Sequence, residues 1–142
     1  MKILFFDDFK LGVLKADGVV DVSETVRDIP HMGPHDLINA LIARFADYRQ
    51  PLEAAVARGQ AIPLGRVRIR PPLPKPFNVD CMAVNYMEDG TRKEPAPINA
   101  FHKSPGCIVG NGETMVLPDI AATIFEGEAE LAGGIRGGGG GR

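Results

Sequence analysis

The sequence lacks tryptophan, contains only two cysteines and has no long apolar run. Cys81 and Cys107 stand alone, without the paired spacing of metal or redox sites, so we expect reduced packing residues instead of a disulfide. No run approaches the roughly 20 apolar residues of a membrane-spanning helix. The first apolar run, residues 3–6, stops at Asp7 and is too short for the core of a signal peptide. These absences predict a cytoplasmic protein that does not span a membrane.

An excess of basic charge is also missing. The 142 residues carry 16 Lys and Arg against 18 Asp and Glu, a formal net charge of -2. Because phosphate binding needs a clustered excess of Lys and Arg, we expect no nucleic-acid partner. Arginines alternate with apolar residues over positions 66–70, which is typical of the exposed face of a strand. The remaining composition, 44% hydrophobic and 24% charged, indicates a globular protein of one domain or two small ones.

Residues 1–70 predict a small α+β lobe. Short apolar runs occupy positions 3–6, 11–14 and 19–22, and Asp17-Gly18 between the last two is typical of a hairpin turn. We therefore expect an antiparallel meander, followed by two helices. The first helix follows Pro34, with apolar residues at helical spacing over positions 37–45, and the second runs from Pro51 to about Arg58. A strand over positions 65–70 completes the lobe.

Four prolines in residues 71–76 predict a stiff, extended linker, because proline suits neither a helix interior nor a central strand. Residues 77–132 then predict a β-rich region with a buried strand over positions 78–86. Shorter strands are expected at positions 100–103, 108–109 and 115–117, separated by Gly and Pro turns. Residues 133–142 contain seven glycines, and we expect them to form a flexible tail.

The stretch from Ile124 to Ala132 carries three acidic residues at alternate positions beside apolar ones. In a strand, Glu126, Glu128 and Glu130 would share one face. Like charges on one face repel one another, and a hard divalent cation such as Mg²⁺ or Ca²⁺ would relieve that repulsion with its oxygen ligands. A solvated strand face gives the same pattern, so the stretch alone leaves both interpretations open.

Several segments, in this order and spacing, resemble the start of the catalytic domain of the fumarylacetoacetate hydrolase family. They are Val84-Asn85-Tyr86, Phe101-His102-Lys103-Ser104-Pro105, Gly110-Asn111-Gly112-Glu113, Val116-Leu117-Pro118 and Phe125-Glu126-Gly127-Glu128-Ala129-Glu130-Leu131-Ala132. The proline-rich segment lies where that family joins its small N-terminal domain to the catalytic one. The resemblance implies an α+β chain whose residues 77–132 form an incomplete mixed β-roll.

The resemblance also implies a chemistry. The family uses Mg²⁺, Mn²⁺ or Ca²⁺ to bind the oxygens of a β-diketo or 2-oxo acid and stabilises the enolate formed when a C–C bond breaks. Isomerases, hydratases and decarboxylases occur in it too. Glu128 and Glu130 match its paired metal ligands, whereas Asn85, Tyr86 and Lys103 match positions beside the substrate. Full-length relatives are commonly homodimers, so a second copy is an expected partner.

Departures from the family pattern lead to two further expectations. Asp89 and Arg92 stand where many members carry a His and a Glu that activate water, and an Asp of normal pKa is a weak base at neutral pH. His102 is the candidate replacement. The family's third metal ligand, a later Asp, has no counterpart here, so we expect a truncated or frame-shifted member with little activity. The alternative is a non-catalytic fragment that pairs with another chain through exposed strands.

Overall fold

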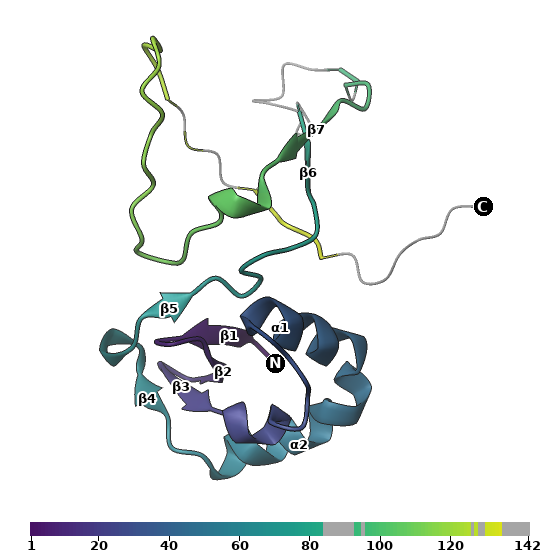
Figure 1. Cartoon of the computed structure of the whole chain (residues 1–142), viewed down its shortest axis with the longest axis vertical. Helices are drawn as coiled ribbons and strands as arrows, with labels where there is room; N and C mark the ends of the chain where they lie inside the picture. The colour runs from purple at the N-terminus through teal and green to yellow at the C-terminus, as the bar shows by residue number, and fades with distance from the viewer. Residues whose placement is uncertain (84–92, 95, 126, 128–129, 135–142) are drawn as a thin grey trace, which may run out of the picture.

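The computed structural model describes residues 1–83, 93–94, 96–125, 127 and 130–134. Its first part is an antiparallel sheet with the strand order β4-β3-β2-β1-β5 (Figure 1). The strands are β1 (Ile3–Phe6), β2 (Lys10–Lys15), β3 (Gly18–Asp21), β4 (Ile62–Pro63) and β5 (Ile69–Arg70). A 3-10 helix (Ser23–Val26), α1 (Pro34–Ala43) and α2 (Phe45–Arg58) connect β3 to β4. The predicted meander and the α+β class are confirmed.

Both faces of this sheet are covered, and each has its own apolar cluster. The face toward the helices buries Phe5 and Leu11 against Leu41 of α1 and Leu52 of α2. Leu4, Phe6 and Val19 lie on the opposite face, packed by Leu14, Leu64 and Val67. Because successive strand residues point to opposite faces, a continuous apolar run such as β1 requires cover on both sides. A second 3-10 helix, Leu64–Arg66, supplies part of that cover.

The turns of the meander differ in detail from the sequence expectation. Lys15 pairs with Gly18, so the central residues of the β2–β3 turn are Ala16 and Asp17, and Ala16 has a φ of 50°. Gly18 begins β3, where a Cβ would lie 2.8 Å from the carbonyl oxygen of Ile62. Gly18 therefore permits the close approach of β4 to β3, and Ala16 takes the left-handed conformation of the turn.

The second helix begins earlier than predicted. α2 starts at Phe45 and includes Pro51, which lacks the N–H that would bond the preceding turn. Pro51 is solvent-exposed, and the buried Tyr48 and Leu52 on either side of it anchor the helix in the core. At the other end, the Lys15 ammonium donates to the carbonyl of Val56 at 2.8 Å, which places a positive charge at the helix C-terminus.

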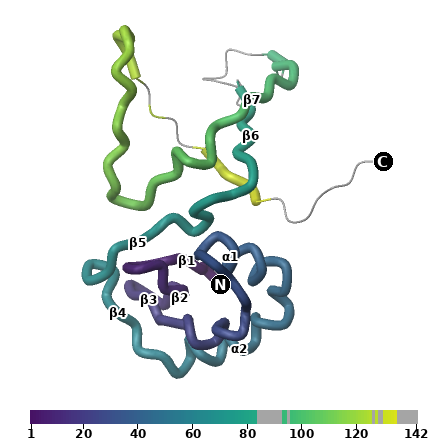
Figure 2. Tube along the Cα trace, in the orientation of Figure 1, coloured from purple at the N-terminus to yellow at the C-terminus, as the bar shows by residue number. Residues whose placement is uncertain are grey.

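The chain leaves this lobe at β5 and enters a second region with little regular structure (Figure 2). Among its described residues, the strands are β6 (Val79–Met82) and β7 (Ala100–Lys103), which pair antiparallel, and a 3-10 helix spans Pro105–Cys107. β6 was expected to be buried but is half-buried at alternate positions. Residues 108–109 and 115–117 form no strand, which corrects the sequence expectation.

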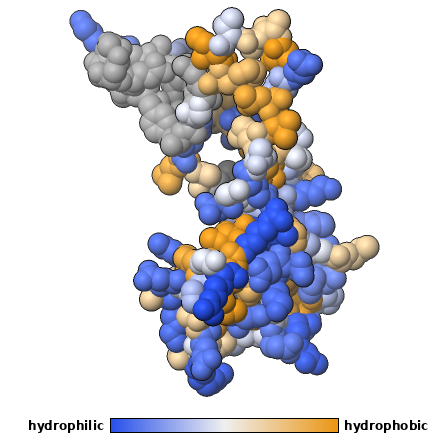
Figure 3. Space-filling view, turned by 90° about the vertical axis from the view of Figure 1, so that its left-hand side faces the viewer, coloured by the Kyte–Doolittle hydropathy of each residue, from blue (hydrophilic) through white to orange (hydrophobic). Residues whose placement is uncertain are grey.

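The carboxylate-bearing stretch is likewise not a strand where it is described, at residues 124, 125, 127 and 130–132. A strand needs a hydrogen-bonded neighbour strand, and none of these described segments belongs to either sheet. Their apolar side chains are instead exposed: Val116 is 87% and Leu131 94% accessible. The surface of the second region is accordingly more apolar than that of the lobe (Figure 3). Within the described part of the chain, no helix combines the length and the apolar character needed to cross a membrane.

Candidate active site

The β6–β7 pair carries two described residues of the predicted site, His102 and Lys103. Its register sets Val79 opposite Lys103 and Asp80 opposite His102. The Asp80 carboxylate Oδ1 lies 2.6 Å from His102 Nδ1, within hydrogen-bond distance. Both side chains are largely exposed. A carboxylate beside one imidazole nitrogen fixes the ring orientation and leaves Nε2 available to a substrate or a water.

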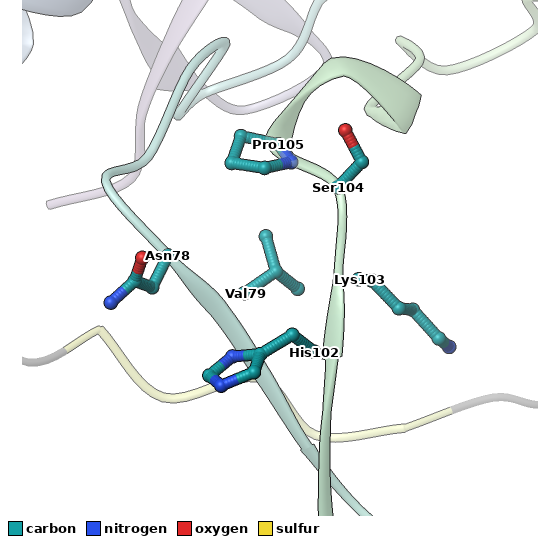
Figure 4. A pocket seen from close by; sticks show the side chains of 6 residues that line it. All are labelled: Asn78, Val79, His102, Lys103, Ser104 and Pro105. Carbon is teal, nitrogen blue, oxygen red and sulfur yellow. The ribbon is translucent and has the colours of Figure 1, made fainter.

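His102 and Lys103 are neighbours in β7 and therefore leave the strand on opposite faces. In Figure 4 the His102 ring turns toward the side of Asn78, whereas the Lys103 side chain extends away from it. The Lys103 ammonium lies 5.7 Å from the centre of the Phe101 ring, in a cation–π contact on its own face. The two predicted catalytic residues are thus close in the chain but do not converge on one point.

A shallow hollow of about 350 Å³ lies where β6 begins and β7 ends. Asn78 and Val79 line it from β6, and His102, Lys103, Ser104 and Pro105 line it from β7 and the following turn (Figure 4). Ser104 accepts a hydrogen bond from the amide of Gly106 at 3.2 Å, which caps the short 3-10 helix behind the hollow. The hollow is open to solvent and has room for a small organic acid.

The remaining predicted site residues are divided between described and undescribed positions. Asn85, Tyr86, Asp89 and Glu128 lie outside the residues that the structure describes, and Glu130 is described and exposed. Among the described residues no group of three or more His, Cys, Asp or Glu side chains could hold a metal ion. These residues do not make a metal centre by themselves, so the Glu128–Glu130 ligand pair stays a prediction.

Two acidic residues of structural importance were missed by the sequence reasoning. Asp80 became significant only through the β6–β7 register, which the sequence does not reveal. Glu113 accepts hydrogen bonds from Arg68 at 2.6 Å and Arg70 at 3.1 Å; Arg68 is exposed, as the sequence predicts, whereas Arg70 is only 19% exposed. The alternation of three arginines in residues 66–70 was the available signal, because a row of like charges favours an acidic partner.

Comparison with known proteins gives a consistent result at the level of fold. No family model matches the chain, and no curated protein matches it. Among solved structures, it is similar to the maleylpyruvate hydrolase of Sphingobium sp. SYK-6 in complex with manganese(II) and pyruvate. The TM-score is 0.72 and the identity 28%, over 84% of this chain and 43% of that one. A second structure of maleylpyruvate hydrolase from Sphingobium sp. SYK-6 gives a TM-score of 0.62 and 28% identity, over 77% of this chain and 38% of that one.

The chain therefore spans less than half the length of the solved enzyme that it resembles. That enzyme is an acylpyruvate hydrolase of the fumarylacetoacetate hydrolase family. The likeness covers most of this chain, including residues beyond the N-terminal lobe, since the lobe alone is about half of the sequence. The comparison supports the fold of the fumarylacetoacetate hydrolase family for this chain.

Proposed function

We propose that this chain provides part of a divalent-metal-dependent hydrolase that cleaves a C–C bond in a 2-oxo or β-diketo acid of the acylpyruvate type. The observation that carries the proposal is the likeness to a hydrolase structure containing manganese(II) and pyruvate, over 84% of this chain. Pyruvate is itself a small 2-oxo acid, which matches the substrate class implied by the sequence motifs.

Glu128 and Glu130 are the proposed metal ligands. Oxygen ligands of this kind suit Mn²⁺, Mg²⁺ and Ca²⁺, and Mg²⁺ in particular keeps several waters when a protein supplies only one or two carboxylates. A metal bound there would supply electrostatic stabilisation at the substrate carbonyl oxygen. Its remaining ligands would be water, substrate oxygens or side chains outside the described residues.

The hollow where β6 begins and β7 ends is the proposed substrate site. Lys103 contributes a positive charge at its rim, which favours a carboxylate as a point charge. Asn85 and Tyr86 lie outside the described residues, and we propose that they contact the substrate because they match positions beside the substrate in the family. His102 is the proposed acceptor of a proton from water, with Asp80 holding Nδ1 so that Nε2 faces the reaction. Asp89 is the second candidate base.

Metal-dependent thermal stability tests this proposal, because an ion that binds only the folded state must raise the unfolding midpoint. We expect millimolar Mn²⁺ to raise the midpoint of the wild type and to leave that of the Glu128→Ala, Glu130→Ala double variant unchanged. A matched control replaces two exposed glutamates of the lobe, Glu24 and Glu53, and should respond like the wild type. An equal response of both double variants would contradict the assigned ligands.

Activity is measured separately, by release of pyruvate from an acylpyruvate in the presence of Mn²⁺. We expect slow turnover that is lost in the same Glu128→Ala, Glu130→Ala variant. Metal binding without turnover would retain the site but remove the hydrolase assignment for this chain.

A second candidate function is a non-catalytic module that associates with another chain, including a second copy of itself. The observation that favours it is the set of exposed apolar side chains in the second region, among them Met115, Val116, Ile124 and Leu131. Light scattering after size-exclusion chromatography distinguishes the cases. A stable dimer without a response to metal would favour the association module, and a monomer that binds Mn²⁺ would favour the hydrolase.

A further inference from the structure

The turn Gly110–Glu113 packs against β5, where the N-terminal lobe ends. Glu113 donates its backbone N–H to the carbonyl of Gly110 at 3.1 Å, and Gly112 has a φ of 76°, which glycine adopts without strain. The backbone amide of Gly110 also donates a hydrogen bond to Oε2 of the Glu113 carboxylate, at 2.7 Å. The turn is therefore closed by both the backbone and the side chain of the same residue.

Two arginines from the end of the lobe meet that carboxylate. Arg68 Nη2 lies 2.6 Å and Arg70 Nη1 3.1 Å from Glu113 Oε1. The Arg70 and Glu113 side chains are only 19% and 21% exposed. Gly110 is buried beneath them, and a Cβ on it would lie 2.9 Å from the carbonyl oxygen of Ile69. The Arg70–Glu113 contact is thus close-packed, unlike the exposed surface ion pairs that contribute little stability, whereas Arg68 is 60% exposed and adds its charge from the rim.

Arg70 also connects this contact to the first turn of the sheet. Its Nε donates to the carbonyl of Asp7 at 2.7 Å, and its guanidinium carbon lies 5.2 Å from the centre of the Phe9 ring. Asp7 and Phe9 both have positive φ values, 47° and 59°, which are uncommon for these residue types. Arg68 donates its amide to the Asp7 carboxylate at 2.9 Å. The Arg68 backbone and the Arg70 side chain are therefore held by contacts within the lobe as well as by Glu113.

The order of elements gives this contact a mechanical consequence. β5 continues directly through Pro71 toward β6, whereas β7 continues through the 3-10 helix Pro105–Cys107 to the Gly110–Glu113 turn. The start of β6 and the end of β7 lie opposite each other at one end of the pair, and that end is attached at β5 twice, through the peptide chain and through Glu113. A two-stranded pair has little stability alone, so its position depends on these attachments.

We propose that Glu113, Arg68 and Arg70, here called the Glu113 cluster, form a lock that holds the β6–β7 pair and its hollow on the N-terminal lobe. The lock is a conformational device of the fold and does not depend on the proposed function. When the cluster is broken, the lobe stays folded, and the β6–β7 pair remains attached only through residues 71–78 and moves away from β5.

Paramagnetic relaxation tests this directly. A nitroxide on Cys107, with Cys81 changed to Ser, lies three residues before Gly110, a chain length of at most about 10 Å. In the otherwise unchanged protein we expect it to broaden the amide signals of Asp7 and Ile69. In Glu113→Gln, which keeps the size of the side chain but removes its charge, we expect that broadening to be lost.

A matched variant completes the experiment. Glu24→Gln removes the exposed ion pair with Arg27 and should leave the broadening unchanged. Broadening that persists in Glu113→Gln would overturn the proposal. So would a collapse of the Val13 and Val20 amide signals in that variant, because the cluster would then stabilise the lobe itself.

Discussion

Gly12 offers a sharp test of how the N-terminal lobe is packed. It lies within β2, and a methyl group added to it would lie 2.3 Å from Val19 Cγ2 and 3.0 Å from Phe6 Cδ1. Both neighbours are almost completely buried, and the β-branched Val19 has little freedom at χ1. Contacts under 3.0 Å essentially never occur and ordinary contacts begin at 3.4 Å, so the Val19 methyl would have to move by about 0.7–1.1 Å.

Such overpacking costs about 1–3 kcal/mol of unfolding free energy. Replacing glycine by alanine also restricts the unfolded chain, which offsets about 0.4–1 kcal/mol of that cost. We therefore expect Gly12→Ala to destabilise the lobe by about 1–2 kcal/mol. For a folding unit of this size, each kcal/mol lowers Tm by about 4–8 °C, so Tm should fall by roughly 4–16 °C.

Thermal unfolding followed by far-ultraviolet circular dichroism measures this change. Gly65→Ala is the matched control, because a Cβ at Gly65 meets nothing within 4 Å. We expect the control to melt at or slightly above the wild-type temperature. If Gly12→Ala melted together with Gly65→Ala, the close packing of Val19 and Phe6 over β2 would be wrong.

Three further predictions concern buried and titrating groups. Leu41→Ala removes a completely buried side chain and should cost about 2–5 kcal/mol in urea unfolding, whereas Met32→Ala, at a fully exposed position, should cost nothing measurable. The hydrogen bond to Asp28, and after it burial, raises the pKa of Tyr48. The stabilisation that this hydrogen bond contributes is therefore complete below the ordinary tyrosine pKa of about 10 and is lost as pH rises through the raised value. Urea midpoints at increasing pH should therefore fall less steeply for Tyr48→Phe than for the wild type, and identical curves would contradict this assignment. The hydrogen bond from the Gly110 backbone amide lowers the pKa of Glu113, and the contacts with Arg68 and Arg70 lower it further, while burial opposes them. The stabilisation that Glu113 contributes is therefore complete above the ordinary glutamate pKa of about 4.3 and is lost as pH falls through the lowered value. The Gly110 amide signal should therefore shift as Glu113 is protonated in nuclear magnetic resonance spectra at falling pH, and Glu113→Gln should abolish that shift.

The N-terminal lobe was readable from the sequence because its signals are local. Alternating apolar runs predicted the meander, and Pro34 with the following apolar spacing predicted α1. The sequence predicts a helix start at Pro51, because proline is common at the first helical position, whereas α2 begins at Phe45. In the structure, burial of Tyr48 and Leu52 outweighs the hydrogen bond that Pro51 cannot make.

The second region was predicted less well because its structure depends on partners far away in the sequence. Residues 115–117 have the composition of a strand, but no described neighbour pairs with them. The Asp80–His102 contact follows from a strand register, and the Glu113 contacts join residues more than forty positions apart. Neither is encoded in a local pattern. The family resemblance supplied the candidate residues, and the structure places His102 and Lys103 at the hollow on opposite faces of β7.

We propose that Glu128 and Glu130 hold a divalent metal beside the hollow where β6 begins and β7 ends. The most direct measurement is the broadening of backbone amide signals by bound Mn²⁺ in uniformly labelled protein. We predict that stoichiometric Mn²⁺ broadens the signals of Glu130, His102 and Ser104 together, and that a Glu128→Gln, Glu130→Gln variant shows no such effect. Broadening that spares His102 and Ser104, or that persists in the double variant, would contradict the claim.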